Sequence, residues 1–284
     1  MIKIQINGGL GNQLFQYATA FSLAKSNKTK LLVDISSAIN YHVHPLRLTE
    51  LNCSAQFDDK ISLYKKILLH PRLIKFSSMI FTSYYIEPSL KYDNTLQYTA
   101  NNKLIIGYFQ SELYFKNCRG ELLKEFLPKT EFSSYQSLLA EKIKGESSLS
   151  IHIRRGDYIT NSNASAIHGV CNKEYFDRAI EYLVEQKKVT TKTNVYIFSD
   201  DIEWCKAHLS FPYSTVYVEG DSQHPELDMW LMSYCNHNII SNSTFSWWGA
   251  WLNTNPNKCV IAPKQWFKTL HDSTDIVPEQ WKRL

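Results

Sequence analysis

An arginine pair behind an apolar, strand-like segment is the part of this sequence best suited to chemistry. Arg154 and Arg155 stand in the run from His152 to Tyr158, which also contains Asp157. A guanidinium fork can bind a phosphate through two parallel hydrogen bonds, and ligands of open α/β sheets gather at the carboxyl ends of strands. We therefore expect one arginine to hold an anionic ligand and Asp157 to pair with the other. Because side chains alternate along a strand, His152 and Arg154 should face the same side.

Three other segments place polar groups directly after predicted strands. Residues 8–13 (Gly-Gly-Leu-Gly-Asn-Gln) and 242–249 (Asn-Ser-Thr-Phe-Ser-Trp-Trp-Gly) each lead into a predicted helix. Free N–H groups at a helix N-terminus attract anions, and glycine lets the backbone approach a ligand closely. Asp200 follows another strand, where a carboxylate could read a base edge or a ribose. Taken singly, each segment is explained about equally well by a tight turn or a helix cap.

The elements that must position these residues alternate between strand and helix in both halves of the chain. The pattern predicts two α/β repeats, with domains at 1–146 and 147–284, a polar linker over 128–148 and a helical insertion at about 41–100. The expected fold is α/β of the GT-B type, in which two Rossmann-like domains face one another across a cleft. The principal strands are expected at 2–6, 31–33, 103–108, 149–153, 194–198, 215–218, 237–241 and 259–262.

Composition excludes several classes of function. A net charge of +4, from 31 basic and 27 acidic residues, is too small for a nucleic-acid-binding face, so no nucleic acid partner is expected. The six cysteines lack metal-ligand spacing and no DxD motif occurs, so we expect no metal and no cofactor. Positive side chains and helix N-termini would then have to stabilise a leaving diphosphate.

The sequence also favours a cytoplasmic location. No signal peptide and no apolar stretch of transmembrane length is recognisable. Residues 63–81 mix basic and apolar side chains, which suggests weak peripheral contact with the inner membrane face. A solvated helix pair explains that segment more simply, since Pro71 interrupts it.

Together these motifs resemble those of the α-1,2-fucosyltransferase family, glycosyltransferase family 11. The resemblance implies an inverting enzyme that moves L-fucose from GDP-β-L-fucose to the 2-hydroxyl of galactose. The acceptor would be a galactose-terminated oligosaccharide or lipid-linked glycan. The segments that carry the likeness are 8–18, 152–158, 226–233 with Cys235 and His237, 241–252, and 261–263 with Trp266.

The same resemblance implies roles for individual residues. In the donor domain, His152 would contact guanine, Arg154 the β-phosphate, and Asp200 guanine N1 and N2. Asn12 and Gln13 would close on the fucose and diphosphate. The expected catalytic residues are Arg154, Asn12 and Asp157, of which Asp157 is named from its place beside the arginines and as a candidate general base. The phosphate seat would be lined by Ser243, Thr244, Phe245 and Ser246.

Several alternatives stay open at the level of sequence. The general base is Asp157, Glu226, Asp228 or a donor phosphate assisted by Asn12. The donor could be another nucleotide sugar, or the protein could bind nucleotides or glycans without catalysis. A dehydrogenase would also show two α/β repeats, and Asp34 would suit its ribose, but the glycine pattern does not match a dinucleotide-binding fingerprint.

Overall fold

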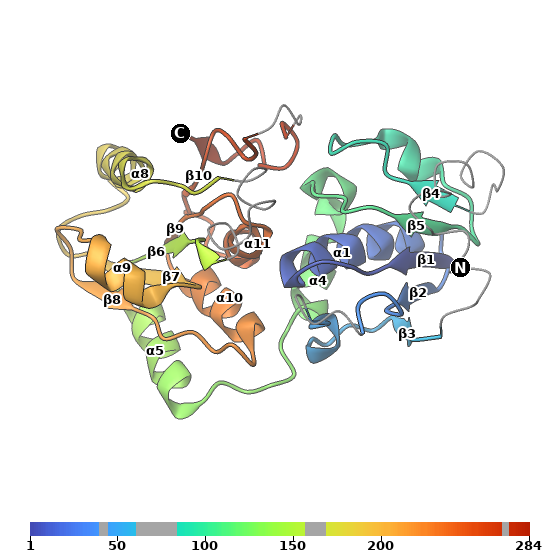
Figure 1. Ribbon diagram of the computed structural model, residues 1–284, viewed down its shortest axis with the longest axis horizontal. Coiled ribbons are helices and arrows are strands. Elements are labelled where there is room, and N and C mark those ends of the chain that lie inside the picture. The colour runs from blue at the N-terminus through green and yellow to red at the C-terminus, as the bar shows by residue number, and fades with distance from the viewer. Residues whose placement is uncertain (40–44, 61–83, 157–168, 269–272) are drawn as a thin grey trace. The chain divides into compact units, whose positions relative to one another are not determined.

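The chain forms two compact α/β units. The computed structural model describes residues 1–39, 45–60, 84–156, 169–268 and 273–284. Unit 1 comprises Met1–Lys129 with Thr274–Ile276, and unit 2 comprises Thr130–Ser273 with Val277–Leu284 (Figure 1). Each unit has its own parallel sheet, which confirms the predicted α/β class with two Rossmann-like domains.

The sheet of unit 1 has the strand order β3-β2-β1-β5-β4, and every pairing in it is parallel. The central β1 is followed by a glycine turn and by the long helix α1, whose inner face is buried. The strands are β1 (Ile2–Gln5), β2 (Leu31–Asp34), β3 (Gln56–Asp58), β4 (Tyr84–Ile86) and β5 (Leu104–Ile106). The helices and single turns are α1 (Leu10–Ser26), η1 (Leu48–Glu50), η2 (Asn94–Tyr98), η3 (Glu112–Tyr114), η4 (Lys116–Cys118) and α4 (Arg119–Glu125).

The described part of the expected helical insertion at 41–100 contains no α-helix. It contributes β3 and β4, which pair with β2 and β5 and form the two edges of the sheet, together with the single turns η1 and η2. Three-residue strands are too short for a period of two to be visible in a sequence. Residues 40–44 and 61–83 lie outside the described residues, and the whole of the basic, apolar segment 63–81 falls within the second of these ranges.

The sheet of unit 2 has the strand order β11-β10-β9-β6-β7-β8, again with every pairing parallel. In chain order this is the 3-2-1-4-5-6 arrangement of a Rossmann fold, with β6 first and β9 fourth. All six residues of β6 are buried, as expected of a central parallel strand. The strands are β6 (Ser148–Ile153), β7 (Asn194–Ser199), β8 (Thr215–Tyr217), β9 (His237–Ile239), β10 (Val260–Ala262) and β11 (Lys282–Arg283).

Helices of unit 2 cover this sheet with apolar faces. In α8 the residues Tyr175, Phe176 and Leu183 are buried, and the Asn172 side chain accepts from the Tyr175 N–H as an N-cap. In α11 three tryptophans are fully buried and contact one another. The helices are α5 (Ser134–Gly145), α8 (Lys173–Glu185), α9 (Ile202–His208), α10 (Pro225–Tyr234) and α11 (Thr244–Leu252).

The division between the units falls at Lys129–Thr130, ahead of the sequence-based boundary at 146. The segment expected to be a linker contains α5, which starts with a capping box between Ser133 and Gln136 and packs against α10 in unit 2. Leu139 and Ile143 are buried there. The polar outer face of α5 dominates its composition, and the sequence therefore resembles a linker.

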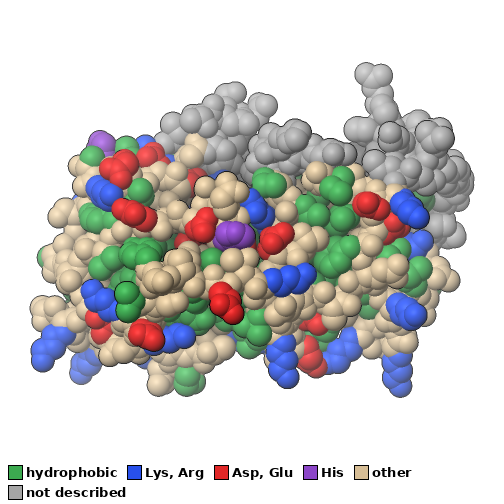
Figure 2. Space-filling view, turned by 90° about the horizontal axis from the view of Figure 1, so that it is seen from below, with side chains coloured by type: hydrophobic (Ala, Val, Ile, Leu, Met, Phe, Trp, Pro, Cys, Tyr) green, Lys and Arg blue, Asp and Glu red, His purple; other side chains and the backbone are tan. Residues whose placement is uncertain are grey.

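The surface mixes charges of both signs. On the face shown in Figure 2, basic and acidic side chains of the described residues are interspersed rather than gathered in a basic stripe. None of the helices that the structure describes is long and apolar enough to cross a membrane.

Candidate functional site

The carboxyl ends of β6, β7 and β9 bring the candidate residues of unit 2 together. β6 is paired with β7 on one side and with β9 on the other, so the strand order reverses at the β6–β9 boundary. Ligands of doubly wound sheets bind at such a switch point. The register sets Ile153 opposite Ser199, and Arg154 therefore leaves β6 beside Asp200 at the end of β7.

Arg154 and Asp200 form an ion pair at this edge. Arg154 Nη1 lies 2.9 Å from Asp200 Oδ2, and both side chains are about one quarter exposed. The other carboxylate oxygen of Asp200 accepts the Arg155 N–H at 2.9 Å. A Cβ added to Gly156 would lie 2.6 Å from Asp200 Oδ2, so glycine leaves room for this carboxylate. Asp200 thus orients Arg154, and its expected contact with guanine stays a prediction.

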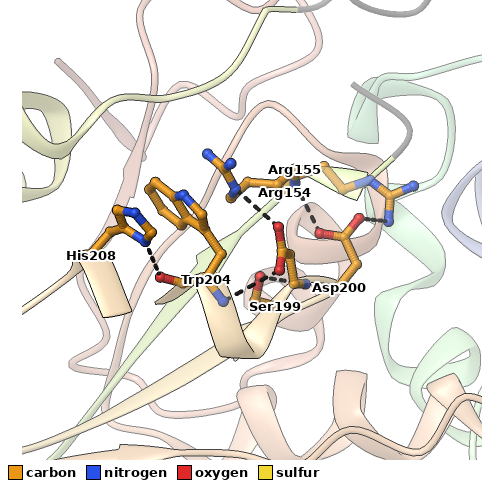
Figure 3. Close-up of polar contacts among 7 residues, drawn as sticks. Arg154, Arg155, Ser199, Asp200, Trp204 and His208 are labelled. Atoms are coloured by element: carbon orange, nitrogen blue, oxygen red, sulfur yellow. Dashed lines mark hydrogen bonds and ion pairs between the residues drawn. The ribbon is translucent and has the colours of Figure 1, made fainter. Parts of the chain in front are cut away.

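Arg155 is directed away from Arg154 (Figure 3). Its guanidinium carbon lies 3.4 Å from the centre of the Trp204 ring, and its Nε lies 3.3 Å from Asp201 Oδ2. Asp201 also caps α9 by accepting the Trp204 N–H, and the His208 ring stacks on Trp204 with centroids 4.6 Å apart. Arg155 is therefore engaged within unit 2, by Asp201 and Trp204. The partner expected for it, Asp157, lies outside the described residues.

His152 is a buried, neutral imidazole at the end of β6. It is only 4% exposed, and its Nδ1 has no hydrogen-bond partner among the described residues. Burial lowers the pKa of His152 to about 4; the positive charge of Arg154 also lowers it, while Asp200 opposes the shift. The Phe245 ring lies 5.7 Å from the imidazole. A buried nitrogen without a partner is suited to a ligand that completes its hydrogen bonding.

The N-terminus of α11 lies at the same edge, after β9. The Ser241 hydroxyl donates to the His152 carbonyl at 2.7 Å and accepts the Arg154 N–H at 3.2 Å, which ties this segment to β6. Ser243 is the N-cap residue and its side chain makes no capping bond. Ser246 differs, because its hydroxyl is fully buried and donates to the carbonyls of Ser241 and Ser243.

The helix start therefore offers anions the Ser243 and Thr244 hydroxyls and the backbone N–H groups of its first turn. Thr244 and Phe245 are both partly exposed. Ser246 serves to shape the turn.

Two acidic side chains occupy the first turn of α10. Glu226 is 1% exposed, and its Oε1 lies 3.0 Å from His224 Nδ1. Asp228 Oδ2 accepts the Asp221 N–H, while its Oδ1 is buried without a partner among the described residues. Burial raises the pKa of Asp228 to about 7, with further contributions from the charges of Asp221 and Glu226. Asp228 therefore titrates near neutrality.

In unit 1 the glycine turn lies at the corresponding switch point, where β1 is paired with β2 and β5. Gly8 adopts a φ of +73°, which requires glycine, and Gly9 is the N-cap of α1. Asn12 and Gln13 stand in the first turn of that helix. The Asn12 Oδ1 accepts from Gln110 Nε2 at 2.8 Å.

Gln13 is fully buried, and its side-chain amide is fully hydrogen-bonded within the protein. Its Nε2 donates to the carbonyls of Gly8 and Pro45, and its Oε1 accepts the N–H groups of Arg47 and Leu48. Gln13 therefore holds the turn against the segment at 45–48. Its expected contact with the donor is not favoured by this geometry.

Trp204 and Gln110 were not recognised from the sequence. Trp204 stands three residues after Asp201, a spacing that suits an N-cap and gives no sign of contact with Arg155. Gln110 is 98 residues from Asn12, and only the pairing of β1 with β5 brings them together. Among the described residues, no group of three or more His, Cys, Asp or Glu side chains is placed to hold a metal ion.

Solved structures share this architecture. The chain aligns with Arabidopsis thaliana FUT1, solved in complex with GDP, at a TM-score of 0.54 and 14% identity, over 92% of this chain and 70% of that one. That likeness concerns the fold, which is GT-B: two α/β units with parallel sheets. The chain therefore has GT-B architecture, with its arginine site at the switch point of unit 2.

Sequence comparison then gives the family. The model of glycosyl transferase family 11 matches residues 1–284, and the chain belongs to this family. It is 35% identical to an α-1,2-colitosyltransferase of Escherichia coli, over 100% of this chain and 99% of that protein. It is 25% identical to the galactoside 2-α-L-fucosyltransferase Sec1 of Mus musculus, over 89% of this chain and 64% of that protein. The predicted family is thereby confirmed.

Proposed function

We propose that this glycosyltransferase moves L-fucose from GDP-β-L-fucose to the 2-hydroxyl of a galactose residue in a glycan, with inversion to an α linkage. The observation that carries the proposal is the edge at β6, where Asp200 orients Arg154 beside the buried, neutral His152 and the start of α11. This set of groups suits a nucleoside diphosphate: a guanidinium and helix N–H groups for phosphates, and an imidazole for a neighbouring polar atom.

In the proposed reaction the 2-hydroxyl oxygen of galactose attacks the anomeric carbon of fucose. The bond from that carbon to the β-phosphate oxygen breaks, and GDP leaves with the bonding electrons. The transition state resembles an oxocarbenium ion. Arg154 would neutralise the charge that grows on the diphosphate, so it contributes more to the transition state than to ground-state binding.

The hydroxyl proton passes to a general base that is still to be assigned. Of the carboxylates considered, Asp228 titrates near neutrality, which suits proton transfer, and Glu226 is buried in contact with His224. Asp157 and a donor phosphate assisted by Asn12 are the other candidates. We expect catalysis without a metal, so that activity survives an excess of EDTA.

A second donor is favoured by a specific relative. The 35% identity to an α-1,2-colitosyltransferase extends over the whole chain. Colitose lacks the 3-hydroxyl of L-fucose. An enzyme that binds this hydroxyl by hydrogen bonds would reject colitose strongly, whereas a pocket shaped for colitose would reject fucose only weakly.

The test is a transfer assay with purified protein, GDP-fucose or GDP-colitose, and a panel of galactosides that includes free and lipid-linked glycans. We expect GDP-fucose to be used, and NMR of the product to show an α-1,2 linkage to galactose. Preferential use of GDP-colitose would replace the donor and leave the class of reaction unchanged. Transfer from neither donor to any galactoside, by protein that is folded and binds GDP, would refute the proposal.

A further inference from the structure

A buried glutamine in unit 1 lies against Asn12. Gln110 follows β5, the neighbour of β1 in the sheet, and is 7% exposed. Its Nε2 donates to Asn12 Oδ1 at 2.8 Å, and its own Oε1 has no partner among the described residues. The two amides therefore meet at the switch point of this sheet.

The backbone that carries Gln110 is held in a fixed conformation. The Glu87 carboxylate, which follows β4, accepts the N–H groups of Tyr108 and Phe109 at 2.6 and 2.9 Å. Phe109 adopts a φ of +53°, a region that residues other than glycine seldom occupy. Burial raises the pKa of Glu87, and these two N–H groups partly offset that rise. Backbone strain held in place by specific contacts is typical of functional sites.

The hydrogen bond from Gln110 decides which end of the Asn12 amide is left for a ligand. In the structure Gln110 Nε2 is the hydrogen-bond donor and Asn12 Oδ1 the acceptor, so the Asn12 oxygen faces Gln110. Asn12 Nδ2 then remains as a donor, and it makes no hydrogen bond with the residues that the structure describes. An oxygen that gains negative charge is stabilised by an N–H group and repelled by an amide oxygen.

We propose that Gln110 is a positioning residue that fixes the orientation of the Asn12 side-chain amide. Asn12 then directs its N–H group toward an oxygen of the transferred sugar or of the diphosphate. This inference rests on the proposed function. The role of Gln110 is indirect, since it acts on the substrate through Asn12.

Two substitutions with opposite chemistry test it. Gln110→Met keeps the length of the side chain and removes the hydrogen bond, leaving Asn12 free to choose its orientation. Gln110→Glu offers acceptors only, so it would bond Asn12 Nδ2 and turn Asn12 Oδ1 toward the substrate. A residue that merely fills space and bonds Asn12 would tolerate Glu better than Met.

We expect kcat to fall about 10-fold in Gln110→Met and about 100-fold in Gln110→Glu, with the Kd for GDP changed less than about twofold. Both variants are then made in an Asn12→Ala background. In that background kcat of the Glu variant should be only about twofold lower than kcat of the Met variant, because no Asn12 amide is left to be reoriented. Melting temperature and GDP binding establish that each variant is folded.

The inference is overturned if the Glu variant is no worse than the Met variant. It is equally overturned if the excess loss persists without Asn12, since the added charge would then act directly. The wild-type enzyme in the same assay separates the two proposals. Absence of transfer by wild type refutes the function, whereas transfer by wild type with additive substitutions refutes only the role of Gln110.

Discussion

The two adjacent arginines of unit 2 have different surroundings and different tasks. Arg154 forms an ion pair with Asp200, and it borders His152. Arg155 is engaged by Asp201 and by the Trp204 ring. Arg154 is therefore the arginine suited to bind the diphosphate, and Arg155 the one that secures the turn after β6.

Replacing Arg154 by lysine tests the first of these tasks. Arg154→Lys keeps the positive charge and loses the planar fork, so we expect kcat to fall about 100-fold or more with a smaller change in GDP affinity. Steady-state kinetics and calorimetric GDP titration measure the two effects. Arg178→Lys, on the exposed face of α8, is the matched control. Near-normal turnover by a folded Arg154→Lys variant would show that the assignment is wrong.

At the scale of elements, the turn after β6 depends on α9. The Asp201 side chain caps α9 and also contacts Arg155, while Trp204, from the first turn of the helix, presents its ring to the same guanidinium (Figure 3). Gly156 leaves space for Asp200 in the same turn. The short helix α9 thereby stabilises the turn after β6, which carries Arg154.

Loss of the Trp204 ring should therefore weaken nucleotide binding from a distance. A cation–π contact contributes about 0.5–2 kcal/mol, so we expect Trp204→Leu to raise the Kd for GDP about 2- to 30-fold. Trp204→Phe, which keeps a ring face, should recover most of the affinity. His208→Ala removes the ring stacked on Trp204 without touching Arg155 and serves as the control. Equal effects of the Leu and Phe variants would argue against the contact.

For the whole molecule, two buried groups of unit 2 link stability to pH in opposite directions. The pKa of Asp228 is raised from 3.8 to about 7, so its contribution to stability is complete below pH 3.8 and is lost as pH rises through 7. The pKa of His152 is lowered from 6.5 to about 4, so its contribution is complete above pH 6.5 and is lost as pH falls through 4.

Removing the charge of Asp228 should accordingly stabilise the protein more as pH rises. We expect Asp228→Asn to unfold with a free energy close to that of wild type at pH 4, and with a higher one at pH 8.5. The linkage relation sets an upper limit of roughly 4 kcal/mol on this gain. Urea denaturation at the two pH values measures it. Glu203→Gln, at an exposed carboxylate, should show no comparable change; a gain in Asp228→Asn that does not grow with pH would contradict the assignment.

Local patterns were sufficient for the family, the α/β class and much of the site of unit 2. Each of the motifs at 8–13, 152–158 and 242–249 is contiguous, and each stands where a strand passes into a turn or helix. Because parallel strands end at one edge of a sheet, the motifs at 152–158 and 242–249 predict a binding edge in unit 2. Asp200 was found in the same way, from its place after β7.

Tertiary structure decided what each side chain does there. Gln13, adjacent to Asn12 in the sequence, is consumed by bonds to the segment at 45–48, whereas the distant Gln110 holds Asn12. α5 belongs to unit 2 because its buried face contacts α10, although its composition is that of a linker. Arg154 and Arg155 are adjacent in the sequence but contact different residues: Asp200 pairs with Arg154, and the Trp204 ring packs on Arg155. Both partners lie some 45 to 50 residues further along the chain. Neighbours in the sequence share a motif, but hydrogen bonds and ion pairs form between groups that the fold brings within about 3 Å, and sequence spacing does not encode that distance.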